Sequence, residues 1–200
     1  MKILLATRNA GKLAELRRIL AAARAPVAAL DLAQFPGVAE IAETGSTFAE
    51  NALIKARAVA AHAGLPAVAD DSGLCVDALN GMPGVLSARW SGKHGDDEAN
   101  LDLVLGQLTD VPDERRGAQF VCAAALVLPS GEETLVRGEW RGTLVRERRG
   151  VNGFGYDPIF RPDGETRTSA ELAPSEKDAV SHRGRALRAL LPALRELADG

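Results

Sequence analysis

Residues 2–13 read Lys-Ile-Leu-Leu-Ala-Thr-Arg-Asn-Ala-Gly-Lys-Leu, and this stretch decides the fold. Residues 2–6 are a short apolar run of the kind that forms a buried strand. From Leu13 onward apolar residues recur at spacings of three and four as far as Pro26, which predicts a helix that ends at this proline. A strand, a short polar loop and a helix in this order are the first step of an α/β fold.

The next part of the chain repeats the alternation of strand and helix. Residues 27–42 are weakly patterned and contain Phe35-Pro36-Gly37, which indicates a short strand and a loop. Residues 47–50, Thr-Phe-Ala-Glu, match a capping box, and apolar residues then recur at helical spacing until Gly64. Residues 67–69 form a short apolar strand.

The second half of the chain changes character. Asp96 or Asp97 is expected to cap a helix, and residues 117–128 and 134–145 are predicted to form a hairpin. A last helix begins near Ser181, where Pro192 is expected to bend or split it. We therefore expect a single α/β domain over residues 1–200, with a mixed, largely extended central sheet flanked by helices and two lobes separated by a cleft.

Composition excludes several classes of protein. The chain has 200 residues, 46% of them apolar and 26% charged, with a formal net charge of −3. No apolar run approaches the ~20 residues of a membrane helix, and the apolar start is too short for a signal peptide. Cys75 and Cys122 match neither a metal-ligand spacing nor a disulfide framework, which favours the cytoplasm. The slightly acidic balance argues against a nucleic-acid coat, so we expect no nucleic-acid partner and no membrane.

The loop over residues 7–12, Thr-Arg-Asn-Ala-Gly-Lys, is the first candidate site. Backbone N–H groups at the positive end of the following helix, together with Lys12, can bind phosphate oxygens. The loop resembles a P-loop but fails its test, because Ala6 replaces the first glycine and Leu13 the magnesium-binding Ser or Thr. The alternative is a tight turn that caps a surface helix.

The second candidate is Asp70-Asp71-Ser72-Gly73, which follows an apolar strand and precedes extended structure that resumes at Leu74. Carboxylates in such a place need a cation or donors, and magnesium prefers one or two carboxylates together with phosphates and waters. Neighbouring strand residues alternate faces, so we expect one Asp to point into the site. An Asp-rich turn is the alternative. Glu43, just before a capped helix that carries Lys55, could add a third carboxylate near Asp71.

The third candidate, residues 153–157, reads Gly-Phe-Gly-Tyr-Asp. Phe154 and Tyr156 are spaced to hold two rings around one flat ligand, because bases stack on aromatic side chains. The alternative is a loop whose aromatic residues fill the core.

The fourth candidate combines Ser175-Glu176-Lys177 with Ser181-His182-Arg183. An Arg in the first turn of a helix opposes the helix dipole unless an anion or a carbonyl-rich ligand compensates, and Arg donors suit a purine O6 or N7. A solvated basic face is the alternative. The basic clusters at residues 115–116 and 146–149 are interpreted as solvated.

Six motifs occur in one order. They are Thr-x-Asn-x-x-Lys at 7–12, Glu-Thr-Gly-x-Thr-Phe-x-Glu-Asn-Ala at 43–52, Asp-Asp-Ser-Gly-Leu at 70–74, Gly-x-Pro-Gly-x-x-Ser-Ala-Arg at 81–89, Phe-Gly-Tyr-Asp-Pro-x-Phe at 154–160 and Glu-Lys-x-Ala-x-Ser-His-Arg at 176–183. Together they resemble the purine nucleoside triphosphate pyrophosphatases also called inosine triphosphatases or XTP/dITP diphosphatases. The resemblance covers residues 2–197.

The resemblance implies Mg²⁺-dependent hydrolysis of the nucleotides ITP, dITP and XTP to the monophosphate and pyrophosphate, by a homodimer that cleanses the nucleotide pool. By position, Glu43 and Asp71 would bind Mg²⁺, Asp71 would also accept a proton, and Ser72 would touch the substrate. The residues implied to hold the triphosphate are Thr7, Arg8, Asn9, Ala10, Gly11, Lys12 and Lys55. Those implied to form the nucleobase pocket are Phe154, Gly155, Tyr156, Asp157, Lys177, His182 and Arg183.

Two positions depart from the family pattern. Arg8 stands where many members have Gly, which would add a phosphate contact or narrow the loop, and Ala42 stands where some have a second Glu. Two rival functions stay open: a pyrophosphatase with another base preference, and a nucleotide-binding regulator without turnover.

Overall fold

The computed structural model describes residues 1–35 and 37–199, so Pro36, which the sequence placed in a loop, lies outside the described residues. The described elements are β1 (Lys2–Leu5), α1 (Ala10–Ala22), β2 (Ala28–Asp31), α2 (Phe48–Ala63), β3 (Ala67–Val76), α3 (Asp97–Gln107), β4 (Gly117–Val127), β5 (Glu133–Leu144), β6 (Phe160–Pro162), α4 (Pro174–Val180) and α5 (His182–Asp199), with short 3-10 helices between them. Among the described residues, no helix is long and apolar enough to cross a membrane.

The strands form one six-stranded sheet in the order β2-β1-β3-β4-β5-β6. β1 pairs in parallel with both β2 and β3, whereas β5 and β6 are antiparallel. The prediction of a mixed sheet with helices is therefore confirmed, as is the tight connection between β4 and β5, where Leu128 N donates to Glu132 O.

The chain divides into two compact units. Unit 1 comprises Met1–Asp71, Cys122–Gly138 and His182–Gly200, and unit 2 comprises Ser72–Val121 and Glu139–Ser181. β3, β4 and β5 each contribute residues to both units.

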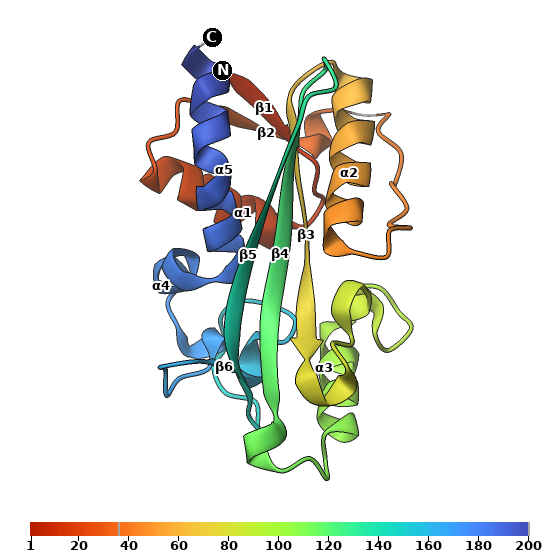
Figure 1. Ribbon diagram of the computed structural model, residues 1–200, viewed down its shortest axis with the longest axis vertical. Coiled ribbons are helices and arrows are strands. Elements are labelled where there is room, and N and C mark those ends of the chain that lie inside the picture. Colours follow the sequence, from red (N-terminus) through yellow and green to blue (C-terminus); the bar gives the residue numbers. More distant parts are fainter. Residues whose placement is uncertain (36, 200) are drawn as a thin grey trace. The chain divides into compact units, whose positions relative to one another are not determined.

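Unit 1 has an apolar core on each face of its strands, because successive strand residues point to opposite faces. Ile3 and Leu5 of β1 pack with α1 and α5, whereas Leu4 packs with α2. Figure 1 shows α1 and α5 on one side of β1 and α2 on the other. α2 forms as predicted: Thr47 caps it by accepting from Glu50 N at 3.1 Å, and Gly64 ends it with a φ of 61°.

Unit 2 has its own core, in which α3 packs against the strands and the aromatic residues. The Phe120 and Phe160 rings lie edge to face with their centroids 4.7 Å apart. Arg116 corrects the interpretation of residues 115–116 as solvated, because it is 2% exposed. Its guanidinium donates to the main-chain oxygens of Leu108 and Leu144 at 2.7 and 2.8 Å, which satisfies the buried charge through backbone dipoles.

Three details differ from the sequence predictions. β3 is one continuous strand that passes through Asp70 and Asp71, so these residues do not form a turn. α4 was not predicted. α5 is neither interrupted nor split at Pro192, because its buried leucines keep the helix packed on the unit 1 core.

Candidate functional site

The phosphate-loop candidate is shorter than predicted. α1 begins at Ala10, so Ala10, Gly11 and Lys12 form its first turn and only residues 7–9 are loop. Asn9 caps the helix, with its side-chain oxygen accepting from Lys12 N at 3.0 Å, and Thr7 Oγ1 accepts from Asn9 N at 3.1 Å. The cap leaves the amides of the first two helical residues at the positive end of α1, which is the arrangement that binds anions.

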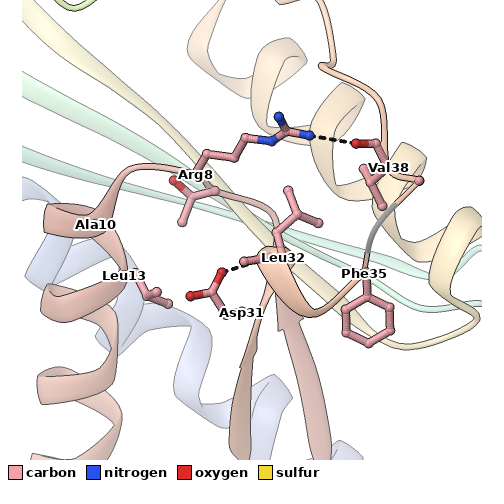
Figure 2. Close-up of a pocket in the computed structure, with 10 residues that line it drawn as sticks. Arg8, Ala10, Leu13, Asp31, Leu32, Phe35 and Val38 are labelled. Carbon is pink, nitrogen blue, oxygen red and sulfur yellow. Dashed lines mark hydrogen bonds between the residues drawn. The ribbon is translucent and has the colours of Figure 1, made fainter.

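A cavity of about 480 Å³ lies beside this loop (Figure 2). Arg8 reaches across it, and its guanidinium donates to Val38 O at 2.7 Å. The side chain that replaces the usual glycine therefore joins the loop to the segment at residue 38. The cavity is lined by Thr7, Arg8, Ala10, Leu13, Asp31, Leu32, Ala33, Phe35, Gly37 and Val38.

A second group in unit 1 surrounds Asp71, which is 6% exposed. Its Oδ2 accepts from Asn51 Nδ2 at 3.0 Å, and its Oδ1 lies 3.6 Å from Lys55 Nζ. Glu43 Oε1 accepts from the same Lys55 Nζ at 2.5 Å. Asn51 and Lys55 are four residues apart on α2, so one helix face supplies both partners. Glu43, Asp71 and Lys55, which we call the carboxylate cluster, combine two negative charges with one positive charge.

Electrostatics at the carboxylate cluster follow from this imbalance. Burial raises the pKa of the Asp71 carboxyl and the negative charge of Glu43 adds to that effect, while Lys55, Lys12 and the hydrogen bond from Asn51 offset only part of it. Burial alone would lower the pKa of Lys55, but the negative charges around it, Asp71 foremost, raise it. A cation placed beside Asp71 would favour the ionised carboxylate and so offset the effect of burial.

Asp70 points to the other face of β3 and joins a different group. Lys12 Nζ lies 3.0 Å from Asp70 Oδ2, and Arg183 Nε donates to the same oxygen at 3.2 Å. The other side of the Arg183 guanidinium donates to the Glu15 carboxylate. Burial alone would raise the pKa of Asp70, but the charges of Lys12 and Arg183 outweigh burial and hold that pKa far below its usual range. These four residues carry equal numbers of positive and negative charges.

Arg183, in the first turn of α5, was expected to need a compensating anion, and the carboxylates of Asp70 and Glu15 supply it. Arg183 is 3% exposed, so the alternative of a solvated basic face is wrong for this residue. His182 is 4% exposed. Its main-chain oxygen packs against Gly138 of β5, and a Cβ added at Gly138 would lie 2.1 Å from that oxygen.

Asp157 organises the aromatic loop of unit 2, defined as residues 153–157. Its Oδ2 accepts from Phe154 N at 2.9 Å and from Lys177 Nζ at 2.6 Å, and its Oδ1 accepts from Ser169 Oγ at 2.6 Å. Gly153 has a φ of 79°, and a Cβ there would be 2.0 Å from the same carboxylate. One buried carboxylate therefore fixes both the backbone of the loop and the ammonium group of Lys177.

The two aromatic rings of the loop have different surroundings. Lys177 Nζ lies 5.2 Å from the centroid of the partly buried Phe154 ring. Tyr156 is 4% exposed, belongs to the unit 2 core and donates its hydroxyl to Ser87 O at 2.8 Å. The prediction that both rings clasp one flat ligand is therefore wrong for Tyr156, because its ring fills the core. Gly155 N donates to Asp97 Oδ2 at 2.9 Å.

Sequence reasoning missed several of these residues. Asn51 carried a signal, because it lies four positions before Lys55 on a capped helix. Glu15 carried none, since its partner Arg183 is 168 positions away. Ser169 also gave no local signal. Ser72 lies in β3 directly after Asp71 and is partly buried.

The chain matches the family model described as the Ham1 family over residues 3–193. A protein of Nocardia farcinica named dITP/XTP pyrophosphatase is 66% identical over 199 residues, which are 99% of this chain and 97% of that protein. A protein of Streptomyces coelicolor with the same name is 61% identical over 196 residues, 98% of each chain.

Solved structures are also similar. A Mycobacterium abscessus crystal structure titled nucleoside-triphosphatase / dITP/XTP pyrophosphatase has 64% identity and a TM-score of 0.78, covering 96% of this chain and all of that one. A HAM1 protein structure from Coxiella burnetii has 46% identity and a TM-score of 0.88, covering 98% and 99% of the two chains.

Proposed function

The chain belongs to the Ham1 family, and on this premise we propose that residues 1–200 form one enzyme domain that hydrolyses dITP, XTP and ITP. The products are the nucleoside monophosphate and pyrophosphate. The observation that carries the proposal is the match, over almost the full length of both chains, to relatives named dITP/XTP pyrophosphatase. We also infer a homodimer, which light scattering of the purified chain would test.

The carboxylate cluster supports a site for Mg²⁺. Among residues 1–35 and 37–199 no three His, Cys, Asp or Glu side chains are grouped to hold a metal ion, but Mg²⁺ is commonly bound by one or two carboxylates, with substrate phosphates and waters completing its shell. Glu43 and Asp71 lie on the same ammonium group of Lys55, which brings their two carboxylates close together, so we assign both as ligands. When bound, the ion would polarise the phosphate oxygens and activate water.

Asp71 is also assigned the acceptance of a proton from the attacking water. Burial raises the pKa of its carboxyl, which makes it a better base than an exposed Asp. Asn51 holds its Oδ2, so the side chain has one orientation before substrate arrives. In this assignment water attacks the α-phosphorus, the bond to the bridging oxygen breaks, and pyrophosphate leaves.

Residues of the phosphate loop are assigned to the triphosphate. The amides of Ala10 and Gly11 at the start of α1 would bind phosphate oxygens, with Thr7 and Asn9 shaping the turn. Lys12 and Lys55 would neutralise the leaving pyrophosphate, a form of electrostatic stabilisation common in phosphoryl transfer. Arg8 would add a further positive charge at the loop.

Base selection is assigned to the remaining residues. The Phe154 ring would stack on the purine, and Lys177 and Arg183 would supply donors for the carbonyl oxygens that hypoxanthine and xanthine carry. Adenine presents an amino group at C6, where a donor would face another donor, so it would be rejected. Ser72, Gly155, Asp157 and His182 are assigned to the same binding step, and Tyr156 supports the aromatic loop from the core.

Pyrophosphate release from equal concentrations of XTP, dITP, ITP, GTP, ATP and dTTP tests the proposal, with Mg²⁺ and with EDTA. We expect turnover of the first three far above the others, and none with EDTA. Turnover that peaks on dTTP or another base would indicate a pyrophosphatase of different preference. Tight nucleotide binding without pyrophosphate release would indicate a regulator, and either result would refute the proposal.

A further inference from the structure

The motif at residues 81–89 has no role in the assignments above, although it turns back along β3. Val76 N donates to Met82 O at 3.1 Å, and Cys75 and Pro83 form an isolated antiparallel bridge. The motif then continues as a 3-10 helix, Gly84–Arg89, in which Ser87 is the buried residue. Ser87 is 7% exposed.

Ser87 makes hydrogen bonds in two directions within unit 2. Its Oγ accepts from Leu74 N at 2.9 Å and donates to Gly84 O at 2.6 Å. Its main-chain oxygen accepts from the Tyr156 hydroxyl at 2.8 Å. A buried hydroxyl is unfavourable unless it is hydrogen-bonded, so these contacts explain a serine where alanine would pack equally well.

Gly73 shows how closely the two segments approach. A Cβ at residue 73 would lie 2.4 Å from Gly84 O and 2.4 Å from Ser87 Oγ. β3 therefore packs with its bare backbone against the turn that presents Ser87. Ser72, the residue before this contact, cannot shift along the strand without breaking the bond from Leu74 N.

The aromatic loop is attached to the other side of the same residue. Tyr156 lies between Gly155 and Asp157, and Asp157 fixes both Phe154 N and Lys177. The buried Tyr156 hydroxyl donates to Ser87 O, and this hydrogen bond fixes the distance between the aromatic loop and the 3-10 helix that carries Ser87. Ser87 thus connects the Ser72 segment, through its side chain, to the Phe154 segment, through its main-chain oxygen.

We propose that Ser87 is a positioning residue that sets the spacing between Ser72 and the aromatic loop, and so the fit of the substrate. The inference rests on the proposed function, because it assumes that Ser72 and Phe154 bind one nucleotide. Ser87 does not touch the reacting atoms in this proposal. Loosening it would displace groups that bind substrate while leaving Asp71 and its proton acceptance unchanged, so the effect falls on KM more than on kcat.

A matched pair of variants tests the proposal. Ser87→Thr keeps the hydroxyl and Ser87→Val has the same shape without it, so their difference isolates the hydrogen bonds of Oγ. We expect the Val variant to raise KM for XTP about tenfold over the Thr variant, the size of one lost buried hydrogen bond, with kcat within about twofold. Ser130→Ala, at the exposed β4–β5 turn, is the surface control.

Tyr156 supplies a second readout that needs no nucleotide. It is the only tyrosine in the chain, so its ionisation can be followed by absorbance near 295 nm. Burial raises the pKa of Tyr156 and the charge of Asp97 adds to it, so if loss of the Ser87 hydroxyl loosens the packing of the Tyr156 ring, the ionisation midpoint should fall toward the ordinary value of about 10 in the Val variant. The Thr variant, which keeps the hydroxyl, should keep the higher midpoint. Circular dichroism in parallel restricts the comparison to the pH range in which both variants stay folded.

Equal KM values and equal ionisation midpoints in the Thr and Val variants would overturn the proposal. If either variant does not fold, Ser87→Ala and Tyr156→Phe test the same connection separately: the first removes the bond of Ser87 Oγ to Leu74 N, and the second removes the bond of the Tyr156 hydroxyl to Ser87 O. Each should raise KM, and the double variant should raise it by less than the product of the single effects; a full product would overturn the proposal. Failure of the wild-type chain to hydrolyse XTP would refute the proposed function, whereas the tyrosine ionisation would still decide the role of Ser87.

Discussion

Replacing Asp71 with Asn separates catalysis from stability. The Asp71 carboxylate is buried, accepts from Asn51 Nδ2 at 3.0 Å and lies 3.6 Å from Lys55 Nζ. Asparagine has nearly the same shape, and its oxygen can still accept from Asn51. The substitution therefore removes one negative charge from the carboxylate cluster and places an amide nitrogen where Oδ1 faced Lys55.

The expected magnitude follows from the charges. The Asp71→Asn substitution makes the carboxylate cluster less negative by one charge, so the variant loses both an assigned ligand and a charge that attracts a cation. Loss of one electrostatic catalytic group typically lowers kcat about 10²–10³-fold, and we expect at least that loss. Stability should not fall. Burial and Glu43 disfavour the ionised form of Asp71 in the folded chain, as its raised pKa shows, so Tm at neutral pH should stay the same or rise.

The assay pairs pyrophosphate release from XTP with thermal unfolding in EDTA. Asp110→Asn, the same substitution at an exposed carboxylate, is the control and should match the wild type in both. A variant that keeps near-normal kcat would refute the assignment of Asp71. A Tm well below that of the wild type would show that the ion pair with Lys55 outweighs the cost of burying the carboxylate, contrary to the reasoning.

Three further outcomes are expected. Phe154→Ala should raise KM for XTP about 5- to 160-fold with little change in kcat, because stacking of one base on an aromatic ring contributes about 1–3 kcal/mol; an unchanged KM would contradict the stacking role. Arg116→Met should lower the free energy of unfolding in urea by about 2–4 kcal/mol, because buried main-chain carbonyls lose charged donors, and a change below the error of the fit would contradict this. Burial raises the pKa of the Cys122 thiol to about 12, so at pH 8 Ellman's reagent should label the folded chain at Cys75 alone, and rapid labelling of two thiols would contradict the burial.

Local signals in the sequence predicted much of the fold. Thr47 and Gly64 mark the ends of α2 because a side-chain cap and a left-handed glycine act within one turn of the helix. The hairpin of β4 and β5 follows from two stretches typical of strands that are joined by a short turn at Pro129-Ser130-Gly131. The start of α1 was placed too late, since Asn9 caps it within the loop that the sequence assigned to residues 7–12.

The predictions that failed concern residues whose contacts come from distant parts of the sequence. Arg116 looked solvated beside Arg115, but its partners are backbone oxygens on other elements, one of them 28 positions away. Pro192 lies inside a continuous α5 because the apolar face of that helix is buried along its length, and packing outweighs the lost hydrogen bond. The break expected at Asp70 and Asp71 is absent for a related reason, since each carboxylate meets cations from a different helix layer.

The contrast between these two aspartates separates a structural carboxylate from a functional one. They are identical in type and adjacent on one strand, yet their surroundings move their pKa values in opposite directions. Around Asp70, the effect of burial on the pKa is outweighed by the charges of Lys12, Arg183 and Lys55. Around Asp71, burial and the charge of Glu43 outweigh the charges of Lys55 and Lys12 and the hydrogen bond from Asn51. Neighbouring titratable groups whose pKa values are shifted in opposite directions commonly have different roles, and the carboxyl with the raised pKa is the one that an added cation or proton stabilises.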